Sequence, residues 1–187
     1  MGIYKDVMST LVRVLAADNI DNSTKQSWQK LIDADLRQGG TGSSLSVRDK
    51  FDYDCCLYAL LHRQLEPAQW DVLVAKYSTH KANKVAAIGR LVARMVSPAP
   101  QLFIYKALTA WAIPKLKGVQ TGKRSTDMIV LPAEFYDMNT WDMEGKPEST
   151  RRRWKTGIAK CLERLEEAAV VHATEIFDRE EIFIDAA

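Results

Sequence analysis

A run of cations marks the expected start of the last long helix. The four cations that follow Pro147 within about two turns are Arg151, Arg152, Arg153 and Lys155. Like charges repel one another, and cations also oppose the partial positive charge at a helix N-terminus, so the arrangement is unfavourable within the protein. An external polyanion would balance it, as DNA does when the first residues of a recognition helix enter the major groove.

A second signal is the absence of acids between Asp71 and Asp127. The whole chain is nearly balanced, with 26 Lys and Arg against 24 Asp and Glu, so about seven acids would be expected in a stretch of this length. Its ten cations are Lys76, Lys81, Lys84, Arg90, Arg94, Lys106, Lys115, Lys117, Lys123 and Arg124. A surface of one sign attracts a polyanion, so the charge pattern favours a nucleic-acid partner.

These signals predict two binding surfaces. The predicted DNA contacts, with the two hydroxyls capping the helix or touching phosphates, are Lys123, Arg124, Lys146, Ser149, Thr150, Arg151, Arg152, Arg153 and Lys155. The second surface, facing DNA or a protein partner, comprises Lys81, Lys84, Arg90, Arg94 and Trp141. Trp141 belongs to it because it stands in a polar loop beside the helix start, where it could contact a partner.

Residue patterns typical of metal and nucleotide sites are missing from the sequence. The three histidines and three cysteines form no His-x-x-x-His or Cys-x-x-Cys pair, so we expect no metal or other cofactor and no enzyme. The segment Gly118–Arg124 departs from the phosphate-loop pattern, because Arg124 stands where a hydroxyl is needed. A basic arm that touches phosphates fits it better, while a carboxylate-based nuclease remains an open alternative.

The elements that must position these residues are predicted to be mainly helices in a bundle. Apolar residues at helical spacing predict helices over 3–17, 23–38, 46–63, 67–77 and 84–96, one opened by Pro98 and Pro100 and ended by Pro114, and one that starts at about 148. At most a small β element is expected. Met128–Leu131 could form a short strand, and Pro132–Met138 reads as a helical turn. For Ile182–Ile184 packing within the fold is favoured, with pairing to 128–131 or docking of a basic partner surface as alternatives.

The glycine-rich segment 39–44 predicts the domain boundary. It separates an N-terminal helical segment, 1–40, from a larger helix-turn-helix domain, 45–187. The most apolar run, Leu102–Ile113, contains Lys106 and is too short to span a bilayer. We therefore expect no membrane partner and a cytoplasmic location.

Two segments resemble region 4 of bacterial sigma factors. Leu65–Tyr77 resembles its opening helix, which runs through a proline and a leucine to an Arg/Lys-Tyr end. Glu148–Thr150, with the arginines after it and Leu162–Leu165, resembles its recognition helix. The resemblance predicts a sigma region 4-like helix-turn-helix and covers about residues 65 to 170.

The same order resembles the phage late-gene transcription antiterminators, the Q proteins. In one Q-like family a Lys-rich turn, an Ala-Leu helix and an aromatic helix follow, and Lys81–Leu91 and Tyr105–Trp111 fit that order. The chain departs from the family in lacking a Cys-x-x-Cys zinc module and in the length of Gly118–Gly145. The resemblance implies binding to double-stranded DNA at a late promoter and to bacterial RNA polymerase near its flap and sigma region 4, in the host cytoplasm. It further implies that termination is suppressed by narrowing of the RNA exit path.

Two other functions remain open on the sequence. The first is a DNA-binding transcriptional regulator without antitermination activity. The second is a phage protein-interaction module that inhibits a host factor, which would use the basic stretch to bind an acidic protein and would not bind DNA.

Overall fold

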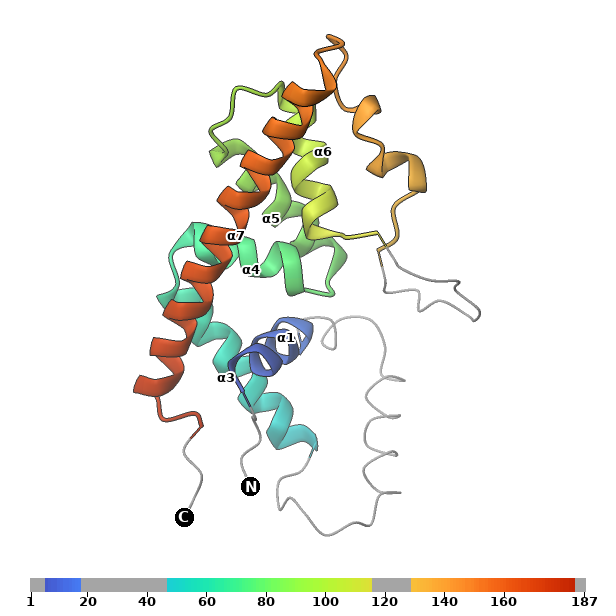
Figure 1. Ribbon diagram of the computed structural model, residues 1–187. Helices are drawn as coiled ribbons and strands as arrows, with labels where there is room; N and C mark the ends of the chain where they lie inside the picture. Colours follow the sequence, from blue (N-terminus) through green and yellow to red (C-terminus); the bar gives the residue numbers. More distant parts are fainter. Residues whose placement is uncertain (1–5, 18–46, 116–128, 184–187) are drawn as a thin grey trace.

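Helices form the fold, as the spacing of apolar residues predicts. The computed structural model describes residues 6–17, 47–115 and 129–183 (Figure 1). Its α-helices are α1 (Val7–Ala17), α3 (Val47–Gln64), α4 (Pro67–Tyr77), α5 (Lys81–Arg94), α6 (Gln101–Ala112) and α7 (Glu148–Arg179), and two short 3-10 helices, η1 (Ala133–Tyr136) and η2 (Met138–Thr140), lie between α6 and α7. These ranges contain no strand, so the mainly-α prediction is confirmed.

Helix α7 runs along one side of the molecule. It has 32 residues, which corresponds to a length of about 48 Å. Figure 1 shows it descending from the upper end of the molecule to the lower end, with α4 and α6 packed against its upper and middle turns and α1 and α3 against its lower half. Its buried residues recur every three or four positions, which is the spacing of one helix face, and are Ile158, Leu162, Ala169, Ala173, Ile176 and Phe177. Cys161 and Ala168, each next to one of these positions, are exposed.

Helix α1 shares its core with the other helices. Leu11, Val14 and Leu15 are at most 1% exposed and belong to the same apolar cluster as the buried residues of α3, α4 and α7. The described part of the predicted N-terminal segment is therefore packed into the larger helical body. The predicted boundary at 39–44 and the helix predicted over 23–38 lie outside the described residues.

Helices α4 and α5 follow one another across a three-residue turn, 78–80. Pro67 occupies the first turn of α4, where its missing N–H costs no hydrogen bond, and Glu66 and Gln69 form a capping box before it. The turn is shorter than predicted because His80 caps α5, with its Nδ1 accepting the Asn83 N–H at 3.2 Å. The two helices pack against each other, and their likeness to sigma region 4 stays a prediction.

The possible small β element is not formed by the residues that can be checked, which agrees with the expectation of at most such an element. Residues 129–131 have no regular secondary structure, and η1 begins after Pro132, in agreement with the predicted helical turn. Ile182 and Phe183 pack on the core instead of entering a sheet, and the Phe183 ring lies edge-on to Phe177 at 5.5 Å. Met128 and Ile184 lie outside the described residues. No helix in the described ranges combines the length and the apolar composition that crossing a membrane requires.

Candidate nucleic-acid interface

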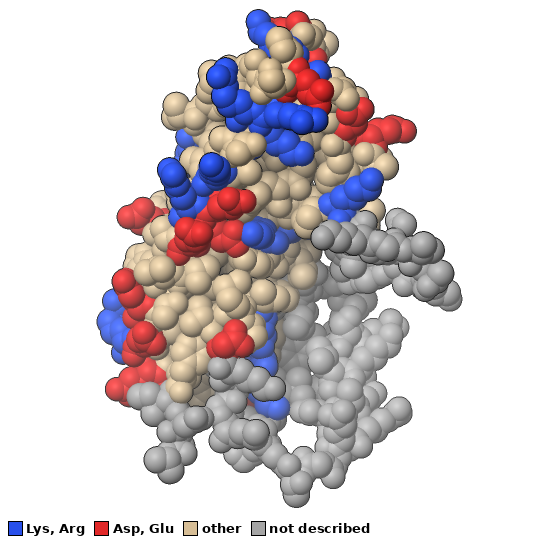
Figure 2. Space-filling model, in the orientation of Figure 1, with Lys and Arg blue, Asp and Glu red and all other residues tan. Residues whose placement is uncertain are grey.

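Helix α7 is divided by charge. Residues 148–162 contain five cations and one acid, whereas 163–181 contain seven acids and two cations. Figure 2 shows the blue side chains gathered over the upper part of α7 and red ones below them, with both signs at the loop at the top. This polarity is the reverse of what the helix dipole favours, and it makes the upper part of α7 the candidate interface.

The arginine run does not form one surface, because successive residues turn by about 100° around a helix. Arg151 stands three residues before Trp154 and seven before Ile158, on the stripe that packs into the core. It is half-buried, and its Nε atom is buried without a hydrogen-bond partner in the described part of the chain. This packing argues against the DNA contact predicted for Arg151, which stays a prediction.

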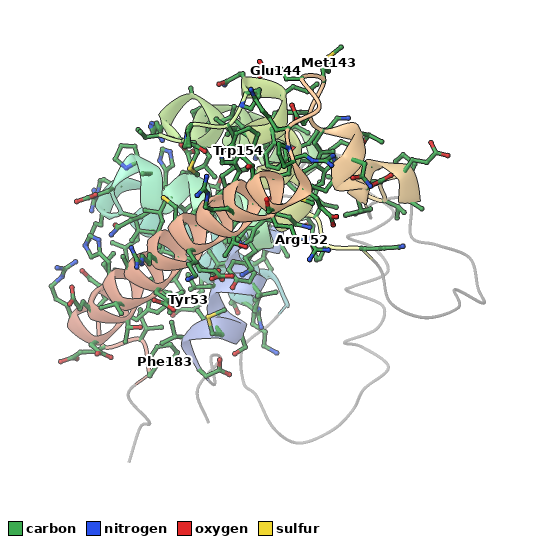
Figure 3. All side chains as sticks on the ribbon, turned by 45° about the horizontal axis from the view of Figure 1, so that its top comes forward. Tyr53, Met143, Glu144, Arg152, Trp154 and Phe183 are labelled. Carbon is green, nitrogen blue, oxygen red and sulfur yellow. The ribbon has the colours of Figure 1, made fainter. Side chains whose placement is uncertain are left out.

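Arg152 lies on the outer side of α7. Its Nη2 atom pairs with Glu148 Oε1, one turn earlier, at 2.6 Å, and both side chains are more than half exposed. Figure 3 shows Arg152 and Trp154 on opposite sides of the α7 ribbon. An exposed pair of this kind contributes little stability, so Arg152 can exchange Glu148 for a phosphate at small cost.

Arg153 and Lys155 occupy the two flanks of the helix. Arg153 is exposed beside the connection between α5 and α6. Lys155 is exposed on the other flank, and its Nζ atom lies 5.2 Å from the centre of the Trp141 ring, within the range of a cation–π interaction.

Two further cations, Lys160 and Arg164, extend the outer surface. They follow Arg153 at intervals of seven and eleven residues, about two and three full turns, so they lie on the same side of the helix as Arg153, and both are exposed. Arg153, Lys160 and Arg164 have no ion pair with another described residue. We call Arg152, Arg153, Lys160 and Arg164 the cationic face. Lys160 and Arg164 were not predicted from the sequence, although their four-residue spacing is visible there.

The first turn of α7 corrects the predicted cap. Pro147 is the N-cap residue and makes no side-chain cap, so Ser149 and Thr150 are the second and third helical residues. Ser149 is exposed and Thr150 half-buried. The N–H groups of Thr150 and Arg151 bond to the Pro147 carbonyl, while those of Glu148 and Ser149 precede the first intrahelical acceptor.

The loop before α7 is held by the buried carboxylate of Asp142. Its oxygens accept the N–H groups of Glu144 at 3.0 Å and Lys146 at 2.6 Å, and Gly145 has a φ of 67° that suits glycine. Lys146 is exposed, with its Nζ atom 3.4 Å from Glu144. Met143 is 90% exposed, and Figure 3 places it with Glu144 at the tip of the loop. The loop is thus fixed beside the first turn of α7.

Trp141 was predicted to be a partner contact, and this prediction is wrong. The residue is 0% exposed. Its ring meets Phe103 edge-on at 5.4 Å, and its indole N–H donates to the Phe135 carbonyl at 2.7 Å. The polar residues around it in the sequence conceal a core position, because the residues that bury it come from α6 and η1.

The predicted surface on α5 is largely used inside the fold. Lys84 is 8% exposed, and its ammonium donates to the carbonyls of Ala75 at 2.8 Å and Lys76 at 3.0 Å, at the end of α4. Burial lowers the pKa of Lys84 from 10.5 to about 8. Lys84 is therefore a cap for α4 and is not available to DNA.

Arg90 and Arg94 are also paired within the protein. Both bond to Asp71 of α4, at 2.7 Å and 2.5 Å, and the hydrogen bond to Asp71 raises the pKa of Arg90 above its ordinary value. Their side chains are 49% and 45% exposed, and the one carboxylate of Asp71 offsets one of their two positive charges. The use of these two residues as a binding surface stays a prediction, and Asp71 competes with any partner for them.

Of the remaining predicted residues, Lys81 is exposed in the first turn of α5. Lys123 and Arg124 lie outside the described residues, as does the segment Gly118–Arg124. Within the described ranges no three His, Cys, Asp or Glu side chains gather where they could hold a metal ion.

Comparison of the chain with protein-family models, curated proteins and solved structures finds no match.

Proposed function

We propose that the protein binds double-stranded DNA through the cationic face and first turn of α7, and that it acts as a phage-type transcription antitermination factor. The observation that carries DNA binding is the exposed row of cations on the upper half of α7, three of which lack an ion pair in the described chain. Cations at this end oppose the helix dipole. Phosphates would relieve this conflict by supplying the missing negative charge.

The geometry favours contact with the phosphate backbone over a purely base-reading role. The cationic face spans thirteen residues of one helix, from Arg152 to Arg164, about 18 Å, so it can follow several phosphates along one groove edge. The free N–H groups of the first turn and the Ser149 hydroxyl add donors suited to phosphate oxygens. The contact to RNA polymerase and the suppression of termination rest on the sequence resemblance to the Q proteins. The proposed location in the host bacterial cytoplasm rests on the same resemblance.

The test of DNA binding is the salt dependence of affinity. A triple variant, Arg152→Ala/Lys160→Ala/Arg164→Ala, should weaken binding to mixed-sequence duplex DNA and reduce the slope of log K against log salt by about 2 to 3, because each phosphate contact contributes about 0.9. The matched control, Arg48→Ala/Lys50→Ala/Arg63→Ala, removes three cations from α3 at the other end of the molecule. The proposal fails if both triple variants change the slope equally or neither does.

Antitermination is tested on a DNA site selected by the protein from a random duplex library. The selected site is placed between a promoter and an intrinsic terminator and transcribed by purified bacterial RNA polymerase. Read-through should rise on this template and stay at the basal level on a template without the site. Site-specific binding that leaves read-through unchanged would instead support a transcriptional regulator.

A protein-interaction module remains the second candidate. It is favoured by the use of Lys84, Arg90 and Arg94 inside the fold, which leaves fewer cations available to DNA than the sequence predicts. Retention of RNA polymerase by the immobilised protein, with no DNA affinity even at low salt, would establish this function and exclude the first.

A further inference from the structure

An apolar pocket opens where the connection between α5 and α6 meets α7. It is lined by Met95–Pro98 on one side and by Arg153, Trp154, Gly157, Ile158 and Cys161 of α7 on the other. Its volume is about 340 Å³, at the lower end of the range for ligand pockets. A cavity of this size accommodates one or two side chains.

Two of the side chains that line the pocket are fixed by packing against the core. Ile158 is 3% exposed, and the Trp154 ring is held edge-on against Phe103 at 5.5 Å. The rim is open and apolar, because Val96 is 98% exposed. At Gly157 a Cβ atom would meet nothing within 4 Å, so the absence of a side chain there contributes to the opening. Apolar surface of this kind gains nothing from phosphates, so it is not part of the DNA contact.

The charge at the rim is positive. Arg153 lines the pocket and has no ion pair or hydrogen bond with another described residue. None of the lining residues is acidic. A ligand that places a carboxylate at Arg153 would gain a charge-assisted hydrogen bond at the edge of an apolar site, where it is stronger than in open water.

We propose that this pocket docks a short segment of a partner protein in which a large apolar side chain stands beside an acidic residue. The apolar side chain fills the space over Gly157, between Trp154 and Val96, and the neighbouring carboxylate pairs with Arg153. This site shares Arg153 with the cationic face, but its apolar part is separate from that face and does not depend on DNA binding.

The experiment selects ligands from a library of random nine-residue peptides displayed on filamentous phage. The target is the full chain carrying Cys55→Ser and Cys56→Ser, so that Cys161 is the exposed thiol of the described residues. Enriched peptides are synthesised, and their affinities are measured by fluorescence anisotropy. Peptides that bind in the pocket should slow alkylation of Cys161, which lines it, by about fivefold at a concentration well above Kd.

Three variants locate the contact. Gly157→Leu fills the pocket and should weaken peptide binding about tenfold or more, while its melting temperature should not fall because leucine favours a helix over glycine. Arg153→Gln removes the rim charge and should cost about tenfold. Val96→Asp places an acid at the exposed rim and should weaken binding of acidic peptides without disturbing the core.

Enriched peptides that pair Leu, Ile, Phe or Met with Asp or Glu and that lose affinity with Gly157→Leu and Arg153→Gln support the proposal. It is overturned if no enriched peptide depends on Gly157, or if the dependent peptides lack acids and bind Arg153→Gln as well as wild type. DNA affinity of Gly157→Leu should remain at the wild-type level, so failure of the pocket and failure of DNA binding are distinguished.

Discussion

Arg90 of α5 and Asp71 of α4 form an ion pair between adjacent helices, with 2.7 Å between Nη2 and Oδ1. Asp71 is 2% exposed and bonds to Arg94 as well. Asp71 is the last acid before the long acid-free stretch in the sequence, yet in the fold it pairs with two of the cations of that stretch. Lys76 pairs with Glu166 at 2.5 Å in the same way. The absence of acids from this stretch of the sequence therefore does not leave these three cations without acidic partners.

Replacing Asp71 by Asn should lower the free energy of unfolding by about 2 to 3 kcal/mol, because a buried hydrogen-bonded carboxylate with two partners is lost. The cost is below that of a fully buried pair, since both arginines are nearly half exposed and can be hydrated. Urea denaturation measures the change. Asp52→Asn, at an exposed position of α3, should change the unfolding free energy by less than about 0.5 kcal/mol. Equal effects of the two substitutions would contradict the assigned role of Asp71.

The helices could be predicted from the sequence, because apolar spacing and caps are local properties. Helix ends in the structure lie close to the prolines that predict them in the sequence, which are Pro67, Pro100 and Pro114. The inward direction of Arg151 was also accessible, since counting back from Ile158 and Trp154 puts it on the buried stripe.

The partners of the predicted cations could not be predicted in this way. Lys76 meets an acid ninety residues away, and Arg90 meets one on the preceding helix. Trp141 is buried by Phe103, which its polar neighbours in the sequence do not indicate. These contacts depend on how the helices pack, and a single sequence carries no direct record of that packing.

Lys84 should make stability rise with pH in mildly alkaline solution. Its pKa in the folded protein is about 8, below the ordinary 10.5, so between these values the unfolded chain binds more protons than the folded one. Stability therefore increases as pH rises through this window. Relative to Lys84→Met, wild type should gain about 1 kcal/mol from about pH 8 to about pH 9. The burial of Tyr77 and its hydrogen bond to Glu166 raise the pKa of that phenol, which acts in the opposite direction but only above the ordinary tyrosine range.

The measurement is urea denaturation of both proteins at each pH. The variant serves as its own control, because all other titrating groups, including the exposed cysteines, are shared and cancel in the difference. An unfolding free-energy difference that stays constant from about pH 8 to about pH 9 would rule out a lowered pKa at Lys84.

Arg151 and Arg152 should respond in opposite ways to replacement by Met. Arg152→Met removes an exposed cation and should weaken DNA binding about three- to tenfold and reduce the salt slope by about 1. Arg151→Met should leave DNA affinity near wild type and should not lower stability, because it removes a buried Nε atom that has no hydrogen-bond partner among the described residues. Gel shift at several salt concentrations and thermal unfolding measure the two effects. If Arg151→Met costs more DNA affinity than Arg152→Met, the orientation of α7 at the DNA is wrong.

Trp141 should contribute to stability and not to partner binding. Trp141→Phe keeps the aromatic contact with Phe103 but removes the donor to the Phe135 carbonyl, and should cost about 1 to 2 kcal/mol. Trp141→Ala leaves a cavity and should cost about 3 to 5 kcal/mol. DNA affinity of the folded Phe variant should equal that of wild type. A Phe variant with unchanged stability and reduced partner affinity would restore the surface role that the sequence predicts.

Ser149→Glu should have opposite effects on the stability of the fold and on DNA binding. Ser149 is exposed in the first turn of α7, where an acid favours the helix dipole and lies one turn from Arg152 and Arg153. The substitution should therefore raise the free energy of unfolding by about 0.5 kcal/mol. In the complex with DNA the introduced carboxylate faces phosphates, so the affinity for DNA should fall about fivefold at low salt. The control Ala168→Glu adds an acid at an exposed position on the acidic half of α7 and should leave DNA affinity unchanged. A Ser149→Glu protein that is more stable and binds DNA as well as wild type would place the first turn of α7 outside the interface. A carboxylate in contact with the phosphate backbone of DNA must weaken binding.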